Sequence, residues 1–207
     1  MIYDFPNKDI PIRQGDIFYP LPLMIIDLDE IAVHIEGVLK EGMWDSIKDE
    51  ENIVVHAPIK RTWGIVATQD CDASRLPVIS FFEISEFKEV TRYELPGSAK
   101  KWMNMITQKS RLNARWFYLP EYEKIGFKYR MAINFGVTFQ ISRDNLEHNL
   151  QKLRRGRLNE IAYQHYRESI AQYFRRYPYD EWYPLSKDEF GEYCKNKDNV
   201  EPFEWQK

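Results

Sequence analysis

The sequence predicts an α+β fold, namely a small antiparallel β-barrel with one inserted helix and a C-terminal helix pair. From residue 12 to about residue 136, apolar segments of strand length follow one another closely, without the long helices that connect parallel strands. In the last third of the chain the apolar spacing becomes helical. We therefore expect a barrel domain at 1–142, a helix pair packed on it at 143–178, and an aromatic and acidic tail at 179–207.

The first two strand segments differ in pattern. Pro20 and Pro22 interrupt the apolar run at residues 15–28, which predicts an edge strand or a bent strand, because proline donates no ladder hydrogen bond. The run at residues 30–39 alternates between apolar and polar residues, so one of its faces is expected in a core. That face carries Ile31, Val33 and Ile35.

The remaining barrel strands follow the same logic. They are expected as two short strands within residues 52–69, and one strand each within 76–87, 114–120 and 129–141. In the last of these, Phe135, Val137 and Phe139 are predicted to share one face. Apolar residues at helical spacing predict the inserted helix near 98–112. Short strands in this order indicate a small barrel of the SH3-like kind.

Two helices are expected in the C-terminal third. Asp144 and Glu147 resemble a capping box, and a narrow leucine stripe follows until Gly156. A second, amphipathic helix begins near Leu158 and ends before Pro178. Its apolar stripe is expected to consist of Leu158, Ile161, Ala162, Tyr166, Ile170, Tyr173, Phe174 and Tyr177.

Composition excludes several functional classes. No apolar run reaches the length of a membrane span, and the N-terminal residues lack the pattern of a signal peptide, so we expect a cytoplasmic protein without membrane contact. Cys71 and Cys194 fit neither a disulfide framework nor a paired zinc motif, so no metal or cofactor is expected. The chain has no glycine-rich phosphate loop and no HExxH or GxSxG motif, and whether it is an enzyme stays open.

The first candidate site is the motif TQDCD, residues 68–72, which follows a buried-type strand. On a continuing strand Asp70 and Asp72 point to the same side, and like charges so close raise the pKa of one carboxyl, which suits acid–base or metal chemistry. The alternative is a turn whose carboxylates accept hydrogen bonds from nearby backbone N–H groups. Both interpretations stay open.

Cys71 invites comparison with a catalytic thiol, because His34 and His56 lie on neighbouring predicted strands. A thiolate needs a base or a positive environment, however, and Cys71 stands between two aspartates. We therefore expect Cys71 to point inward as a small apolar residue.

A second motif, RQGDIF, covers residues 13–18. Gly15 permits an unusual backbone conformation just before the strand, and Asp16 is expected to cap the turn or to accept from Arg13 or Arg61. The alternative is an ordinary turn before a strand.

Together, RQGDIF and TQDCD resemble the start of the PemK/MazF-like toxin barrels, over residues 11–90 at most. This resemblance implies a toxin-like endoribonuclease with its site at the barrel mouth. It places Arg13, Gly15 and Asp16 at the start of the motif and Thr68 at the end of the later strand. With the two carboxylates of TQDCD, the candidate catalytic residues are Asp70, Asp72, Thr68 and Arg13.

A second resemblance covers more of the chain. The order QGDIF, TQDCD and YRESIAQYFRRYP is similar to a group of uncharacterised prokaryotic proteins with a QGDI…TQ-x-CD pattern. It implies an accessory protein of a multi-component or antiviral defence-type system. Asn134 stands where such proteins commonly carry aspartate, which weakens a three-carboxylate metal site.

The third candidate is a basic segment. Residues 150–177 hold seven basic residues against two acidic ones, whereas the tail that follows has a local charge of −4. Arginines beside tyrosines suit phosphates and stacked bases, but the two charged segments also suit pairing with each other. The candidate nucleic-acid or partner-binding residues are Arg154, Arg155, Arg157, Arg175 and Arg176.

These observations favour a non-catalytic interaction module, an accessory subunit that docks on a larger protein subunit, with nucleic acid as a second partner. The alternative function is the toxin-like endoribonuclease.

Overall fold

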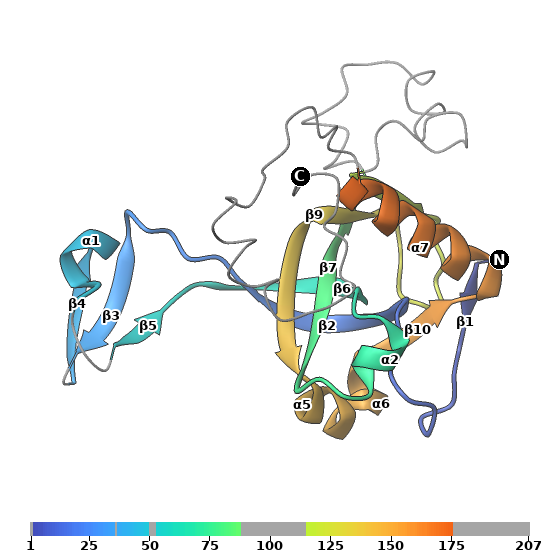
Figure 1. Ribbon diagram of the computed structural model, residues 1–207, viewed down its shortest axis with the longest axis horizontal. Coiled ribbons are helices and arrows are strands. Elements are labelled where there is room, and N and C mark those ends of the chain that lie inside the picture. Colours follow the sequence, from blue (N-terminus) through green and yellow to red (C-terminus); the bar gives the residue numbers. More distant parts are fainter. Residues whose placement is uncertain (1, 36, 50–52, 88–114, 176–207) are drawn as a thin grey trace, which may run out of the picture. The chain divides into compact units, whose positions relative to one another are not determined.

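The computed structural model describes residues 2–35, 37–49, 53–87 and 115–175 (Figure 1). All strand pairs are antiparallel and form two sheets, one of seven strands in the order β1-β10-β2-β6-β7-β9-β8 and one of three strands in the order β4-β3-β5. The α+β class is therefore confirmed. Neither sheet closes on itself within these residues, so the SH3-like barrel is not confirmed.

The elements occupy most of the predicted segments. The large sheet consists of β1 (Tyr3–Asp4), β2 (Asp16–Met24), β6 (Ile59–Val66), β7 (Val78–Glu86), β8 (Trp116–Leu119), β9 (Met131–Ser142) and β10 (Arg154–Leu158). The small sheet consists of β3 (Ile31–Ile35), β4 (Val38–Gly42) and β5 (Val54–His56). The helices are α1 (Trp44–Ile47), α2 (Asp70–Ala73), α5 (Arg143–His148), α6 (Leu150–Leu153) and α7 (Glu160–Arg175).

Strand β2 lies inside the large sheet, so the prediction of an edge strand is wrong for its first half. Residues Asp16–Phe18 pair with both β10 and β6, whereas from Leu21 onward the described pairing is with β6 alone. The register shifts between Phe18 and Leu21, around Pro20. The prolines therefore fall in the half of the strand that has one paired side, where a missing N–H donor is tolerated.

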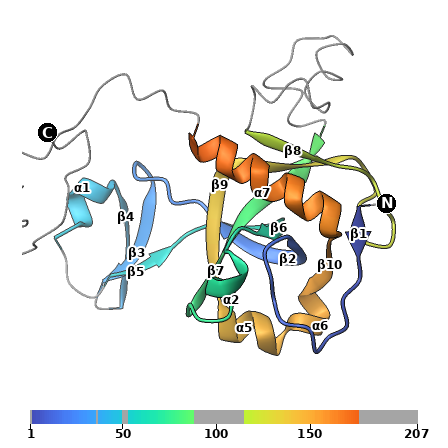
Figure 2. The ribbon, with the colours of Figure 1, turned by 45° about the vertical axis from the view of Figure 1, so that its right-hand side comes forward.

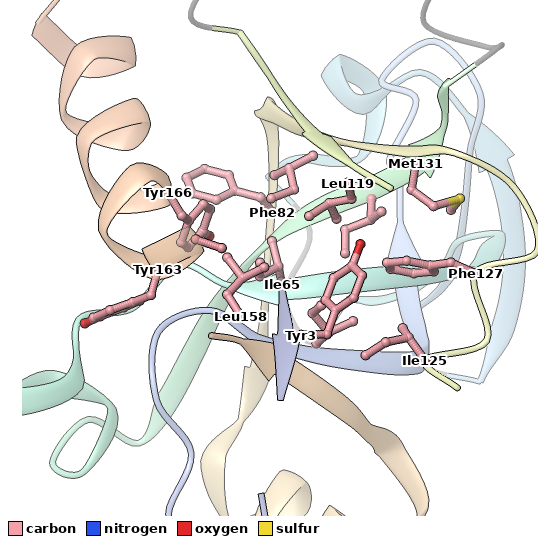
Figure 3. Packing of buried hydrophobic residues seen from close by; sticks show 14 of the residues in the cluster. Tyr3, Ile65, Phe82, Leu119, Ile125, Phe127, Met131, Leu158, Tyr163 and Tyr166 are labelled. Carbon is pink, nitrogen blue, oxygen red and sulfur yellow. The ribbon is translucent and has the colours of Figure 1, made fainter. Parts of the chain in front are cut away.

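Two apolar cores form from the two faces of the large sheet. Adjacent residues of β7 illustrate the division, because Phe81 belongs to one core and Phe82 to the other. The Phe82 core includes Tyr163 and Tyr166 of α7, as Figure 3 shows, and Figure 2 shows α7 lying over this face. The Phe81 core includes Leu146 of α5. Each face of the sheet is thus covered by helices from the C-terminal third.

Strand β9 changes face along its length, so the prediction that Phe135, Val137 and Phe139 share one face is wrong. Asn134 pairs with Glu83, but Thr138 pairs with the adjacent Phe82, which leaves residues 135–137 as a bulge. Phe135 consequently lies in the Phe82 core, whereas Phe139 stacks on Phe81 with ring centroids 5.5 Å apart.

The first helix of the expected pair forms over residues 143–153 as the two short helices α5 and α6, and the prediction is wrong only beyond Leu153. Residues 150–153 make a single turn, and the following Arg154–Leu158 forms strand β10 between β1 and β2. Gly156 permits this position, because a Cβ there would collide with Ile125 and lie 3.0 Å from the Asp4 carbonyl oxygen. The cap of α5 is Ser142 rather than Asp144, since the Ser142 hydroxyl accepts a hydrogen bond from the Asn145 N–H.

The second predicted helix is confirmed as α7, with a changed packing face. Tyr163 packs in the core, whereas Ile161 and Phe174 of the predicted stripe are exposed. Among the described residues, no helix is long and apolar enough to cross a membrane. The predicted helix near 98–112, the tail at 179–207 and Arg176 lie outside the described residues.

Residues 25–58, which we call the insert, join β2 to β6. The last registered pair of these strands is Met24 with Ile59, and the small sheet with α1 lies entirely within the insert. The predicted alternation is confirmed, because the inward residues of β3 are buried in a core of their own with Ile47. That core consists of Ile31, Val33, Ile35 and Ile47.

Because Met24 and Ile59 already pair, we expect the large sheet to fold without the insert. Replacing residues 25–58 by Asn-Gly, the preferred two-residue hairpin turn, should preserve a single cooperative unfolding transition. Its urea midpoint should be at least that of the full chain, since a shorter connection costs less closure entropy. Loss of cooperative unfolding would show that the insert belongs to the main folding unit.

Candidate functional site

The first polar cluster surrounds Asp16, the fully buried first residue of β2. Arg157 of β10 donates to both carboxylate oxygens, from Nε to Oδ1 at 2.5 Å and from Nη2 to Oδ2 at 2.9 Å. Arg154 adds a third contact, from Nη1 to Oδ2 at 3.3 Å. We call these three residues the Asp16 cluster. A carboxylate placed between two guanidinium groups keeps its charge in the protein interior at a tolerable cost.

The same two arginines also hold the N-terminal segment. Arg154 donates to the carbonyl oxygens of Asn7 and Ile10 at 2.6 and 2.8 Å, and Arg157 donates to that of Pro11 at 3.0 Å. Only 4% of the Arg154 side chain and 9% of the Arg157 side chain are exposed. Burial lowers the pKa of Arg154, and the charge of Asp16 opposes that shift. These guanidinium groups thus serve the fold and do not face a solvent-borne phosphate.

The other predicted binding arginines lie apart from this cluster. Arg155 is exposed, and its Nε donates to the Tyr19 carbonyl oxygen at 3.0 Å. Tyr19 in turn stacks on Trp63, with ring centroids 4.3 Å apart. Arg175 is exposed at the C-terminal end of α7, a helix about 22 Å long that begins at Glu160. Of the predicted binding arginines that the structure describes, two are thus buried beside Asp16 and two are exposed.

The second polar cluster joins the two sequence motifs. Asp70 Oδ1 accepts from the Gln14 backbone N–H at 2.8 Å, and its Oδ2 accepts from the Tyr163 hydroxyl at 3.0 Å. Gln14 Nε2 donates to the Ala67 carbonyl oxygen at 2.7 Å. The Arg13 guanidinium lies over the Tyr163 ring, 5.0 Å from its centroid. Of the four predicted catalytic residues, Arg13 and Asp70 thus both contact Tyr163, Arg13 at its ring and Asp70 at its hydroxyl.

Tyr163 was not predicted to contact either motif. Its hydroxyl is a donor, because burial raises its pKa, and the hydrogen bond to Asp70 and the charge of Asp70 raise it further. Arg13 and Arg167 flank the ring and act in the opposite direction. At neutral pH the phenol therefore stays protonated, as a hydrogen-bond anchor does and a nucleophile does not.

The remaining residues of TQDCD have separate surroundings. The Thr68 hydroxyl oxygen accepts from the Ser80 N–H at 2.8 Å. Strand β6 ends at Val66 and helix α2 begins at Asp70, so the two aspartates do not share a strand face, and Asp72 is exposed. Cys71 is exposed as well, so the prediction that it points inward is wrong. In the helical turn α2, the residue that points into the core is Ala73, which is buried.

A third polar group lies on β7 and β9. Glu83 is buried, and its Oε1 accepts from Lys60 Nζ and from the Thr62 hydroxyl, both at 3.3 Å. Asn134 pairs with Glu83 across the strands, and its amide oxygen accepts from the Gly136 N–H at 3.0 Å. Among the described residues, no three His, Cys, Asp or Glu side chains gather as metal ligands.

The surface of the insert is apolar to an unusual degree. Eight of the fifteen large hydrophobic residues that are exposed in the described chain belong to it, and two more, Met24 and Ile59, stand at its base. The eight are Ile25, Ile26, Leu28, Val38, Leu39, Met43, Val54 and Val55. Leu39 and Val54 flank His34 on the sheet face opposite to the core of the insert, with exposures of 52% and 60%.

Comparison with known proteins gives no match to a protein-family model, and no curated protein matches the chain. The toxin-like and accessory-protein resemblances stay predictions.

We expect Asp16→Asn to lower the free energy of unfolding by about 3–5 kcal/mol, because it leaves two buried guanidinium groups without a counter-charge. Urea denaturation measures this change. Asp9→Asn, an exposed carboxylate in the same N-terminal segment, is the matched control and should change the value by less than about 0.5 kcal/mol. Equal effects of the two substitutions would contradict the role of the Asp16 cluster.

The two carboxylates of TQDCD should differ in their effect on stability. Asp70→Ala leaves the Gln14 N–H and the Tyr163 hydroxyl without their acceptor, which should cost about 1–2 kcal/mol. Asp72→Ala, at an exposed position, should stay within about 0.5 kcal/mol of the wild type. Thermal and urea unfolding of both variants check this. If Asp70→Ala leaves stability intact, the anchoring interpretation is wrong and the catalytic one gains support.

Proposed function

We propose that this chain is a non-catalytic docking module that binds a larger protein subunit through its insert. The observation that carries the proposal is the concentration of exposed apolar side chains on the insert. Scattered surface hydrophobic residues are normal, but a concentration of them in one small segment is typical of an interaction surface. The insert also has a core of its own, so its exposed residues are surplus to its folding.

The register of the small sheet defines the binding face. On this face Leu39, His34 and Val54 form one row across β4, β3 and β5, and Glu41, Ala32 and His56 form the next. The opposite face carries Ile31, Val33 and Ile35, which pack with Ile47, and the exposed Val38 and Val55 at its margins. Leu39 and Val54 are thus apolar anchors on an otherwise polar face, an arrangement that protein interfaces use.

The charge of the insert supports a partner with a basic surface. The insert holds nine acidic residues against two lysines, a formal charge of −7, although the whole chain carries only −3. A surface that is both acidic and apolar is complementary to a protein surface with basic residues around apolar ones. It repels nucleic acid, and it repels a second copy of itself, since both would carry the same charge.

The large sheet contains the strands from which the insert starts and to which it returns. Asp16 lies at the beginning of β2, whose other end leads into the insert. The residues of the two sequence motifs contribute to this sheet through the Asp16 cluster and the Tyr163 contacts. In this proposal the motifs stabilise the scaffold, and the insert makes the functional contact.

The experiment is affinity purification from the native host, combined with a photo-cross-linking residue at position 39. We expect a stoichiometric protein partner that survives nuclease treatment, cross-links at position 39, and contacts the insert through a basic surface. The double substitution Leu39→Ser and Val54→Ser should abolish its recovery while thermal stability stays unchanged, because both side chains are exposed. Raising the salt concentration should weaken the association.

The matched control is Ile161→Ser on α7, which removes an exposed apolar side chain outside the insert. This variant should recover the partner like the wild type, and a cross-linker at position 161 should not reach it. A partner that cross-links equally at both positions, or that is retained by the double variant, would refute docking through the insert.

A further inference from the structure

Two histidines of the insert face each other across its sheet. His34 lies on β3 and His56 on β5, and the pairs Ala32 with His56 and His34 with Val54 place both imidazoles on the same face, as diagonal neighbours. Their ring centroids are 4.5 Å apart, with an angle of 60° between the rings. Nδ1 of His34 and Nε2 of His56 are in direct contact.

This contact brings two lone pairs to one point. A neutral imidazole has one nitrogen that donates and one that accepts, so two facing nitrogens are satisfied by sharing a single proton. A metal cation about 2.0–2.1 Å from each nitrogen accepts both lone pairs at once, after the two rings rotate about their side-chain bonds to make room for it. Imidazole nitrogen suits Zn²⁺, Ni²⁺ and Cu²⁺, whereas Mg²⁺ and Ca²⁺ prefer oxygen ligands.

We propose that His34 and His56 form a two-histidine binding site for a divalent transition-metal cation. The two histidines lie on paired strands, which hold their backbone positions next to each other in the absence of metal, while the side chains are free to adjust. Both residues are accessible, since His56 is exposed and His34 is half-buried. The charge of −7 on the insert raises the local concentration of cations.

The composition of the site determines how it behaves. Among the described residues no third His, Cys, Asp or Glu completes a cluster, so water or a ligand from another molecule occupies the remaining positions of the metal. Such a site is open rather than structural. Binding requires the lone pairs of both imidazoles, so protons compete with the metal and the affinity falls as the pH decreases.

The test is calorimetric titration of the full chain with Ni²⁺ and, separately, Zn²⁺, at pH 7.5 and pH 5.5, after removal of any polyhistidine tag. A background of Cys71→Ser and Cys194→Ser removes both thiols of the chain as competing ligands. We expect one Ni²⁺ per chain at pH 7.5 and none at pH 5.5. His34→Gln and His56→Gln should each lower the affinity by at least about tenfold, a loss that even outer-shell changes reach in metal sites.

Two matched controls and a second readout make the result decisive. His148→Gln and His165→Gln change the other two histidines of the chain, which lie in α5 and α7, and should bind Ni²⁺ like the wild type. In NMR spectra, paramagnetic Ni²⁺ should broaden the imidazole signals of His34 and His56 first. The proposal is overturned if the wild type binds with a Kd above about 1 mM, or if the variants at positions 34 and 56 bind like the controls.

The metal site and the docking function are tested independently. Partner recovery by His34→Gln reports on docking, whereas Ni²⁺ binding by the Leu39→Ser and Val54→Ser double variant reports on the metal site. That double variant keeps both histidines and should bind Ni²⁺ like the wild type.

Discussion

A buried carboxylate between two guanidinium groups is the constraint on which the rest of this structure depends. Asp16 begins β2, and Arg154 and Arg157 bring β10 against it, although about 140 residues separate the two strands in the chain. None of these charges is tolerable alone in the interior. The pairing of these charges accompanies the observed strand order, in which β10 lies between β1 and β2. A barrel built only from hairpins between consecutive strands would not contain this pairing.

The contacts around Tyr163 complete the same junction. Asp70 accepts from Gln14 and Tyr163, so one side chain ties the loop before β2, the turn after β6 and helix α7. Tyr166 adds a hydrogen bond from its hydroxyl to the Val66 carbonyl oxygen at the end of β6, inside the core. Residues of both sequence motifs thus take part in this junction, and their catalytic role stays a prediction.

The insert and the large sheet differ in which side chains they bury and which they expose. In the large sheet the polar side chains with the deepest burial are paired within the chain. In the insert, apolar side chains are exposed and acidic residues predominate. A surface of that kind gains free energy when a complementary protein covers it. In the proposed function, stability and recognition therefore belong to different segments of one chain.

The sequence by itself determined the local structure. Alternation predicted the inward face of β3, apolar runs predicted β5 to β9, and helical spacing predicted α7, because these patterns depend on residues close together in the chain. Only the tertiary structure decided the secondary structure and the burial of the arginines around Gly156. Their spacing resembles a basic helix junction, but pairing with β2 and burial against Asp16 turn them into a central strand. Likewise, the bulge in β9 and the meeting of His34 with His56 follow from register between strands, which no local pattern encodes.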